Sequence, residues 1–273
     1  WPKDADFALL ITHDIDSDEC AENITKFLDF EQKKEIPSTI FTVSELKNLK
    51  LIDNIFKRYK KKTIEISSHG YDHSHSLLLD SEEKCSKKME SIINKLEHFN
   101  IVGFRSPVLL RNREILEKLK PYFDYDSSFP TTDLNLNGIC GCGTVFPYIN
   151  DNIVEIPISI PMDFVYIMLK CEEQRIIEEF EKLLARIKRI SGCAVFIFHS
   201  NNHLSIREKY FKVFKRIINK IKQNSDDIYL TTCRDLVENW IRRSQLSISY
   251  KDNEFFISHP KTNNIQEFRV CFF

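Results

Sequence analysis

Short apolar segments rich in β-branched residues alternate along the chain with longer segments of helical periodicity. Residues 7–12 are apolar almost without interruption, which is typical of a strand buried on both faces. In residues 18–34, apolar side chains recur at intervals of three and four positions, the spacing of the buried face of a helix. The same criteria predict further strands at 38–43, 63–67, 102–105, 123–127, 153–159, 194–198 and 228–231, and further helices at 44–60, 81–99, 172–190, 206–223 and 234–243. Ser44, followed by Glu45, is expected to open the helix at 44–60.

The alternation of strands and helices predicts the fold class. Strands that are separated by long helices pair in parallel through right-handed crossovers. We therefore expect an α/β fold, a deformed (β/α) barrel of about 7–8 parallel strands, with an open doubly wound sheet as the alternative. Residues 246–250 and 254–258 flank a turn pair, and 268–273 is a further β-prone segment. The predicted organisation is one barrel domain over 1–243 and a short β-rich appendage over 244–273.

Composition narrows the classes of protein. Apolar residues make up 42% and charged residues 29% of the 273 residues, which excludes a disordered chain. Lys and Arg number 39 against 40 Asp and Glu, so no basic excess is available for binding nucleic acid. Gly is scarce, at 6 residues, which argues against a Gly-rich nucleotide loop, and we expect no organic cofactor. The 8 Cys contain no Cys-x-x-Cys pair and are expected to be ordinary thiols.

The sequence carries no pattern that indicates a membrane. No run of about 18 apolar residues occurs, and no charged start precedes an apolar stretch with a small-residue cleavage site. We therefore expect no membrane span, and the pattern slightly favours the cytoplasm.

Ionisable residues follow nearly every predicted strand. Because the carboxyl ends of parallel strands meet at one end of a barrel, these side chains are expected to line a single site. They are Asp14 and Asp16 after the first strand, His69 and His73 after the third, Arg105 at the end of the fourth, Asp126 around the fifth, Asp163 after the sixth and His199 after the seventh. The irregular segment 133–148 contains three Gly and two Cys, and one interpretation is a functional loop over the same face.

The spacing of His69 and His73 favours a metal site. Four positions apart, two imidazoles share one face of a helical turn and can bind a single ion. A carboxylate from Asp14 or Asp16 would complete a set of two His and one Asp, with positions left for water and substrate. A polar surface turn is the alternative interpretation of the pair.

Two carboxylates two positions apart at one strand end repel each other unless their environments differ. A cation could hold one of them and a guanidinium the other, which would separate a metal ligand from a general base. Arg105 is the candidate guanidinium, and His199, which ends a buried strand, is the candidate general acid. His13 and His75 are further imidazoles, for which supporting or surface positions are expected.

These residues resemble the motifs of the NodB-type polysaccharide deacetylases, carbohydrate esterase family 4, over residues 5–240. The family's first, second, third and fifth motifs are similar to Thr12-His13-Asp14-Ile15-Asp16, to His69 through His73, to Arg105-Ser106-Pro107-Val108 and to Ile197-Phe198-His199. Gly70 stands in place of a hydroxyl residue, and Val108 in place of an aromatic one. The fourth motif, an Asp near a Trp, is only weakly echoed at Asp163.

The resemblance implies a divalent metal, Zn²⁺ in the first place, with Co²⁺, Mn²⁺ or Ni²⁺ as alternatives. It implies Asp16, His69 and His73 as metal ligands, Asp14 as the catalytic base, Arg105 as the residue that orients Asp14, the Val108 backbone N–H as oxyanion donor and His199 as the general acid. The implied reaction is hydrolysis, which removes N-acetyl groups from the amino sugars of a poly- or oligosaccharide or a glycoconjugate.

Three alternatives stay open at this point. An amidohydrolase of the same fold could act on a non-sugar amide, as allantoinase-like relatives do. A catalytically inactive relative could bind carbohydrate through a relic site. An Fe(II) oxygenase also uses two His and one carboxylate, although such sites usually occur on double-stranded β rolls rather than on alternating strands and helices.

Overall fold

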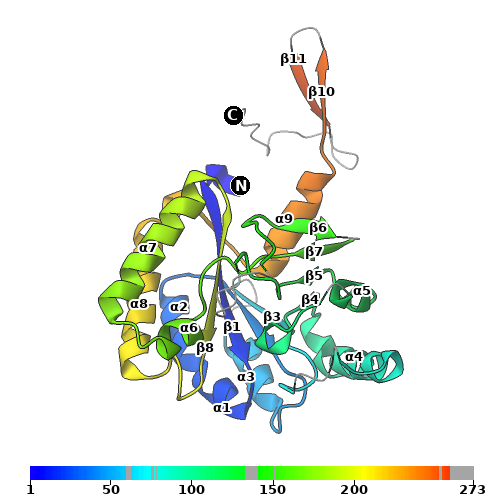
Figure 1. Ribbon diagram of the computed structural model, residues 1–273, viewed down its shortest axis with the longest axis vertical. Helices are drawn as coiled ribbons and strands as arrows, with labels where there is room; N and C mark the ends of the chain where they lie inside the picture. The colour runs from blue at the N-terminus through cyan, green and yellow to red at the C-terminus, as the bar shows by residue number, and fades with distance from the viewer. Residues whose placement is uncertain are drawn as a thin grey trace.

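A computed structural model of the protein describes residues 1–59, 63–74, 77, 79–112, 114–132, 141–150, 152–251 and 254–258. Its centre is a sheet in the order β6-β7-β5-β4-β3-β2-β1-β8, with β9 paired to the start of β1 (Figure 1). The strands are β1 (Phe7–Ile15), β2 (Ser38–Thr42), β3 (Ile64–Ser68), β4 (Gly103–Phe104), β5 (Tyr125–Asp126), β6 (Tyr148–Asn150), β7 (Ile153–Glu155), β8 (Cys193–His199) and β9 (Ile228–Leu230). All neighbours run parallel except β6 and β7.

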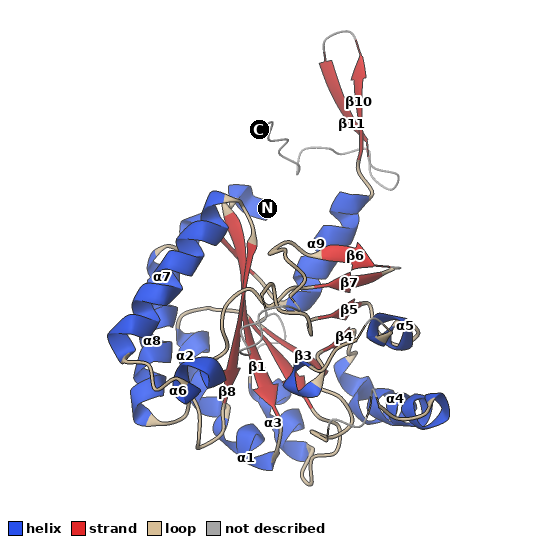
Figure 2. Cartoon of the chain, in the orientation of Figure 1, coloured by secondary structure: helices blue, strands red, loops and turns tan. Residues whose placement is uncertain are grey.

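Helices lie around the sheet (Figure 2). They are α1 (Asp18–Asn23), α2 (Thr25–Lys33), α3 (Lys50–Arg58), α4 (Glu82–Leu96), α5 (Ile115–Leu119), α6 (Asp163–Met168), α7 (Glu173–Arg189), α8 (Glu208–Gln223) and α9 (Cys233–Ser244). The predicted α/β class with parallel strands is confirmed. Within the described residues no strand pairing joins β8 or β9 to β6, so hydrogen bonds do not close the sheet into a full ring.

The two faces of β1 show why the fold places a site where it does. All nine residues of β1 are buried. Successive side chains of a strand point to opposite faces, so Phe7, Leu9 and Ile11 join the core under the helices, whereas Ala8 and Leu10 join a separate inner cluster. The inner face then turns polar, continuing with Thr12 and Asp14 toward the carboxyl end. The interior next to β1 is therefore apolar at the amino end of the strand and polar at its carboxyl end.

The helix α9 covers the amino end of this interior. Its residues Cys233, Leu236 and Val237 belong to the inner cluster. Its first turn is fixed by polar groups from the sheet, since Cys233 N donates to Thr39 Oγ1 at 2.9 Å and Arg234 N donates to Glu65 Oε2 at 2.9 Å. Helix N–H groups in the first turn have no partner within the helix, so these buried oxygens satisfy them.

Some predicted elements differ from the structure. The predicted helix 44–60 begins only at Lys50, because residue Ser44 is held instead by the loop after β3: its N donates to Gly70 O and its Oγ to Tyr71 O, both at 3.1 Å. The predicted helix 18–34 forms as the two helices α1 and α2. The strand β6 and the short helices α5 and α6 were not predicted.

The appendage agrees with the pattern where it is described. β10 (Ser247–Lys251) and β11 (Glu254–Ser258) pair antiparallel as a hairpin separate from the main sheet. The predicted strand 268–273 and the part of the predicted loop at 133–140 lie outside the described residues. The division of the chain at 243 stays a prediction.

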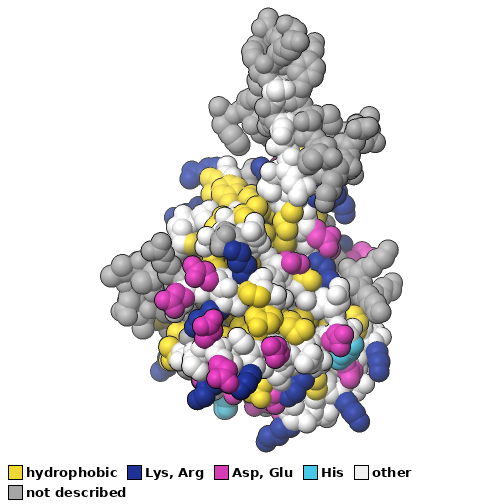
Figure 3. Space-filling model, turned by 90° about the vertical axis from the view of Figure 1, so that its right-hand side faces the viewer, with side chains coloured by type: hydrophobic (Ala, Val, Ile, Leu, Met, Phe, Trp, Pro, Cys, Tyr) yellow, Lys and Arg dark blue, Asp and Glu magenta, His cyan; other side chains and the backbone are white. Residues whose placement is uncertain are grey.

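The structure also bears on the expectations for the cysteines, for membrane-spanning helices and for surface charge. The described cysteines are free thiols: Cys20, Cys85, Cys142, Cys171, Cys193 and Cys233. Among the described residues, the helices are too short or too polar to cross a lipid bilayer. Acidic and basic side chains are interspersed over the face shown in Figure 3, which matches the net charge of −1.

The polar anchor of α9 gives a prediction about stability. Thr39→Val preserves the shape of the side chain but removes the hydroxyl that donates to Glu65 and accepts from Cys233 N. The unpartnered buried groups are expected to lower the free energy of unfolding by about 1–3 kcal/mol, measured by urea denaturation. Thr132→Val, at an exposed position, should change it by less than about 0.5 kcal/mol. An equal loss in both variants would contradict the anchor.

Candidate active site

The predicted site residues meet in a cavity of about 300 Å³ at the carboxyl ends of the strands. Its lining includes Asp14, Asp16, His69, His73, Val108 and His199. Arg105 lies behind this wall, with its side chain fully buried. The structure thus brings together the seven residues that the family resemblance implied for the site, whereas Asp126 and Asp163 do not line this cavity.

Asp16, His69 and His73 form a cluster that could hold a metal ion. Their ligand atoms lie within 4.8 Å of one another, and Asp16 Oδ1 is 3.3 Å from His69 Nε2 and 3.4 Å from His73 Nε2. Asp16 Oδ1 is buried and has no hydrogen-bond partner among the described residues. Burial raises the pKa of Asp16, but the adjacent imidazoles of His69, His199 and His73 lower it further, so the carboxyl is ionised.

The tautomer of His69 directs a lone pair at this cluster. His69 Nδ1 lies 2.9 Å from Arg105 O, and because a carbonyl can only accept, Nδ1 carries the hydrogen. In the neutral ring Nε2 then has a free lone pair that faces Asp16, the arrangement that a metal-binding imidazole requires. The donor set of one carboxylate oxygen and two imidazole nitrogens therefore fits a divalent cation.

The loop between the two imidazoles is bent rather than helical, unlike the helical turn that the spacing suggested. Gly70 has φ +88°, a conformation that favours glycine, and a Cβ at this position would lie 3.2 Å from the ring of Pro107. The hydroxyl of Ser68 accepts a hydrogen bond from Gly70 N at 3.1 Å. These contacts explain why Gly stands where the family pattern has a hydroxyl residue.

Asp14 lies between a guanidinium and two imidazoles. Arg105 Nη1 donates to Asp14 Oδ1 at 2.7 Å, while Oδ2 lies 4.0 Å from His69 Nε2 and 3.9 Å from His199 Nε2. Burial raises the pKa of Asp14, but the charge of Arg105, followed by those of His69 and His199, outweighs it and lowers the pKa below its ordinary value. Asp14 is therefore an ionised carboxylate with one oxygen turned toward the cavity.

Four of the five N–H donors of Arg105 make hydrogen bonds inside the protein. Nη1 also donates to Thr12 Oγ1 at 2.7 Å, and Nε and Nη2 donate to the carbonyl and hydroxyl of Ser127, each at 3.0 Å. The guanidinium carbon lies 4.0 Å from the centre of the Phe41 ring. A buried charge is stable only when it is paired and hydrogen-bonded in this way, so Arg105 is a fixed part of the site rather than a surface residue.

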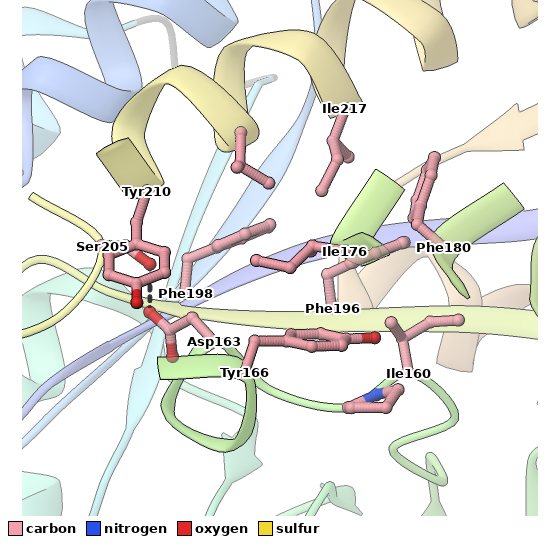
Figure 4. A pocket seen from close by; sticks show the side chains of 12 residues that line it. Ile160, Asp163, Tyr166, Ile176, Phe180, Phe196, Phe198, Ser205, Tyr210 and Ile217 are labelled. Carbon is pink, nitrogen blue, oxygen red and sulfur yellow. Dashed lines mark hydrogen bonds between the residues drawn. The ribbon is translucent and has the colours of Figure 1, made fainter. Parts of the chain in front are cut away.

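His199 is held by Asp163, the first residue of α6. His199 Nδ1 and its backbone N each lie 2.7 Å from an oxygen of Asp163, which also accepts from Ser205 Oγ. Figure 4 shows Asp163 and Ser205 beside the rings of Phe198 and Tyr210. Burial lowers the pKa of His199, but the charge and hydrogen bond of Asp163, with Asp14 and Asp16, outweigh it and raise the pKa to about 10. The ring is therefore protonated, with Nε2–H facing Asp14.

Asp163 and the partners of Arg105 are site residues that sequence reasoning underrated or missed. Asp163 was only a weak motif echo, yet it fixes both the main chain and the ring of His199. Thr12 could have been found, because the alternation of β1 places it on the same face as Asp14. Ser127 ends the predicted strand 123–127, but no sequence pattern indicated that its hydroxyl binds Arg105.

Val108 lines the cavity in a strained turn. Its φ is +49° and that of Leu109 is +53°, and the Val108 side chain is 51% exposed. Positive φ is rare for a β-branched residue and persists only where the surrounding structure holds it.

The two additional histidines are not part of the cluster that the structure describes. His13 points to the opposite face of β1, where Nε2 lies 2.8 Å from Glu31 Oε1 and the ring is fully buried. His13 is therefore a buried residue of the helix-covered core. His75 lies outside the described residues.

Comparison with known proteins agrees with the motifs. Residues 3–122 match the family model of polysaccharide deacetylase, a segment that contains Asp14, Asp16, His69, His73, Arg105 and Val108 but not Asp163 or His199. No curated protein matches the sequence.

Solved structures share the fold at low sequence identity. A Mycobacterium smegmatis protein named as a polysaccharide deacetylase is 20% identical with a TM-score of 0.72, over 89% of this chain and 93% of its own. PuuE allantoinase is 14% identical with a TM-score of 0.70, over 88% and 92%. A carbohydrate esterase family 4 pseudoenzyme from Bacillus anthracis is 13% identical with a TM-score of 0.53, over 84% and 65%. The resemblance to the NodB-type polysaccharide deacetylases is thereby confirmed, in sequence over residues 3–122 and in fold over most of the chain.

Proposed function

We propose that this chain is a metal-dependent deacetylase that hydrolyses the N-acetyl groups of a carbohydrate. The observation that carries the proposal is the convergence of three different devices on one cavity. These are a metal-binding cluster, a carboxylate held by a guanidinium and an imidazole held by a carboxylate. Each device supplies one requirement of amide hydrolysis: an electrophilic centre, a general base and a general acid.

Asp16, His69 and His73 would hold the metal. Three protein ligands with an open position are typical of catalytic Zn²⁺ sites, and Co²⁺, Mn²⁺ or Ni²⁺ are alternatives. A cation bound there would supply Lewis acidity, which polarises a carbonyl and acidifies water.

Asp14 would act as the base. Its free oxygen faces the cavity, and the bond from Arg105 fixes its orientation and keeps it ionised. It would take the proton from the water that attacks the acetamide carbon. The Val108 backbone N–H would donate to the oxyanion that forms, at a turn next to the cavity.

His199 would act as the acid. Its protonated ring lies on the far side of Asp14 from Arg105, with Nε2 3.9 Å from Asp14 Oδ2. It would give its proton to the departing amine as the C–N bond breaks, and the products are acetate and a free amino sugar. Asp163 restores the charged ring by favouring its protonated form.

An N-acetylated carbohydrate is the favoured substrate because the family match covers the segment that holds the base, the three metal ligands and Arg105. A non-sugar amide is the second candidate, since an allantoinase shares the fold and Val108 stands where the family pattern has an aromatic residue. The presence of all three devices disfavours an inactive relative, even though a pseudoenzyme also shares the fold.

The reaction is tested with Zn²⁺-loaded protein and N-acetylglucosamine oligomers. Acetate release that a chelator abolishes and added Zn²⁺ restores is the expected result. Hydrolysis of ureides without acetate release would assign the protein to non-sugar amides. Bound metal without hydrolysis of either class would indicate an inactive relative.

The separate roles of base and ligand give a second prediction. Asp14→Asn should retain the metal and lose about 10²–10⁴-fold in kcat, because the base is gone while the ligands remain. His73→Ala should lose both metal and turnover, because one of three ligands is gone. Metal content and acetate release are measured on the same samples. Full activity in Asp14→Asn would refute the base.

The pairing of His199 with Asp163 gives a third prediction, on pH dependence. The raised pKa keeps the acid protonated as pH rises, so activity that needs this proton persists to high pH and is lost on passing the raised pKa. Asp163→Asn removes the charge that raises it, and the alkaline limb of kcat should therefore move to lower pH. Ser205→Ala, which removes only a hydroxyl from Asp163, should move it less. An unmoved limb in Asp163→Asn would contradict the assignment.

A further inference from the structure

Two carboxyl groups lie side by side in the interior and take no part in the steps above. Asp126 ends β5 and Glu155 ends β7, and the parallel register places the two residues directly opposite each other. Neither exposes any surface. By strand alternation both point away from the inner cluster that holds their neighbours Tyr125 and Val154. Two ionisable groups therefore occupy one space without water access.

The hydrogen bonds around Asp126 and Glu155 indicate that one proton lies between the two carboxyl groups. Ser128 donates to Asp126 twice, from Oγ at 2.7 Å and from N at 3.2 Å. Phe129 N donates to Glu155 Oε1 at 3.0 Å, whereas Glu155 Oε2 is buried and meets no donor among the described residues. Burial, then the charge of Asp126 and the hydrogen bond to it, raise the pKa of Glu155 well above its ordinary value. A protonated Oε2 that donates to Asp126 satisfies the otherwise unpartnered atom.

The groups that face the pair, within the described part of the chain, are consistent with one shared proton. Arg105 acts on Asp126 and favours a single negative charge there. Cys142 and Tyr148 face Glu155 from the segment that precedes β7. Burial raises the pKa of both Cys142 and Tyr148, so that these two groups are neutral and add no charge at neutral pH.

A continuous chain of hydrogen bonds links the pair to the candidate site. The Ser128 hydroxyl, which donates to Asp126, accepts a hydrogen bond from Ser106 N at 2.8 Å. Ser106 follows Arg105 directly and precedes the strained turn at Val108. Because that turn persists only if its surroundings hold it, the anchor at Ser106 bears on where the Val108 N–H points.

We propose that Glu155 and Asp126 share one proton and act as a positioning pair for the Arg105–Val108 segment. The inference rests on the proposed deacetylase function, which assigns that segment its task. Without the donor at Glu155, Asp126 and Ser128 would shift and move the Val108 N–H away from the oxyanion. An oxyanion donor acts on the transition state, so kcat should fall while KM changes little.

Two substitutions of one residue separate positioning from general stability. Glu155→Gln keeps the length and a donor for Asp126 but cannot ionise, whereas Glu155→Met has similar length and no donor. Glu65→Gln is the matched control, because Glu65 is also a buried carboxyl of the sheet but lies on the inner face, bound to Thr39 and the start of α9.

The expected results concern the backbone of the segment and turnover. The amide NMR resonances of Ser106 and Val108 should stay in place in Glu155→Gln and Glu65→Gln and shift in Glu155→Met. In the active enzyme, kcat should fall about 10-fold in Glu155→Met only, with KM and bound metal unchanged. If Glu155→Met does not fold, Ser128→Ala, which cuts the link between the pair and Ser106, should give the same shifts.

The shared proton is observed directly by infrared spectroscopy. The difference spectrum of wild type minus Glu155→Gln at neutral pH should contain the carbonyl band of a protonated carboxyl group, and its absence would overturn the shared proton. Unmoved Ser106 and Val108 resonances in Glu155→Met would overturn the positioning. Neither spectroscopic readout needs turnover. If the protein releases no acetate but gives both spectroscopic results, the proposed deacetylase function is wrong and the proposed positioning pair still stands.

Discussion

A guanidinium group that is removed from water is stable only if it is paired and hydrogen-bonded, and Arg105 makes four hydrogen bonds to groups that belong to the site or lie beside it. Its side chain binds Asp14, Thr12 and Ser127, and its own carbonyl accepts from His69 Nδ1. One residue thereby orients the candidate base and sets the tautomer of a candidate metal ligand. The geometry of both follows from the need to pair one buried charge.

The pairing of buried groups also gives residues of the same type different chemical properties. Asp14 and Asp16 lie on one face of the strand end, but Asp14 meets a guanidinium and Asp16 meets two imidazoles. The imidazoles differ in the same way, since His69 is fixed by a neutral carbonyl and His199 by a carboxylate. A neutral ring can bind a cation, whereas a ring paired with a carboxylate is held protonated. The different partners thus distinguish the proposed ligand, the proposed base and the proposed acid within one cavity.

The pattern of apolar residues predicted the main strands and helices well, because burial of one or both faces of an element determines where its apolar residues lie. The strands β1, β2, β3 and β8 are buried along their length, and their apolar pattern is visible without the structure. The candidate metal cluster was predictable for the same reason, since its residues follow such strands. Strands were also predicted at 123–127 and 153–159, but local patterns do not specify which strands pair or in which register, so the Asp126–Glu155 pair between β5 and β7 could not be predicted.

Asp163 and Ser44 show a second limit of sequence reasoning. Asp163 acts through contact with His199, which is 36 residues away, and no local pattern encodes such a contact. Ser44 has the composition of a helix cap, but hydrogen bonds to the loop after β3 hold it in place. Local propensity was overridden by tertiary contacts in both cases.

The proposed chemistry depends on one divalent cation held beside Asp14 by three residues from two separate segments of the chain. Anomalous diffraction from crystals grown with Zn²⁺ measures this most directly. We expect one strong peak about 2.0–2.2 Å from Asp16 Oδ1, His69 Nε2 and His73 Nε2 together. Saturating Zn²⁺ with no peak at this position, or with a peak bound by other residues only, would contradict it.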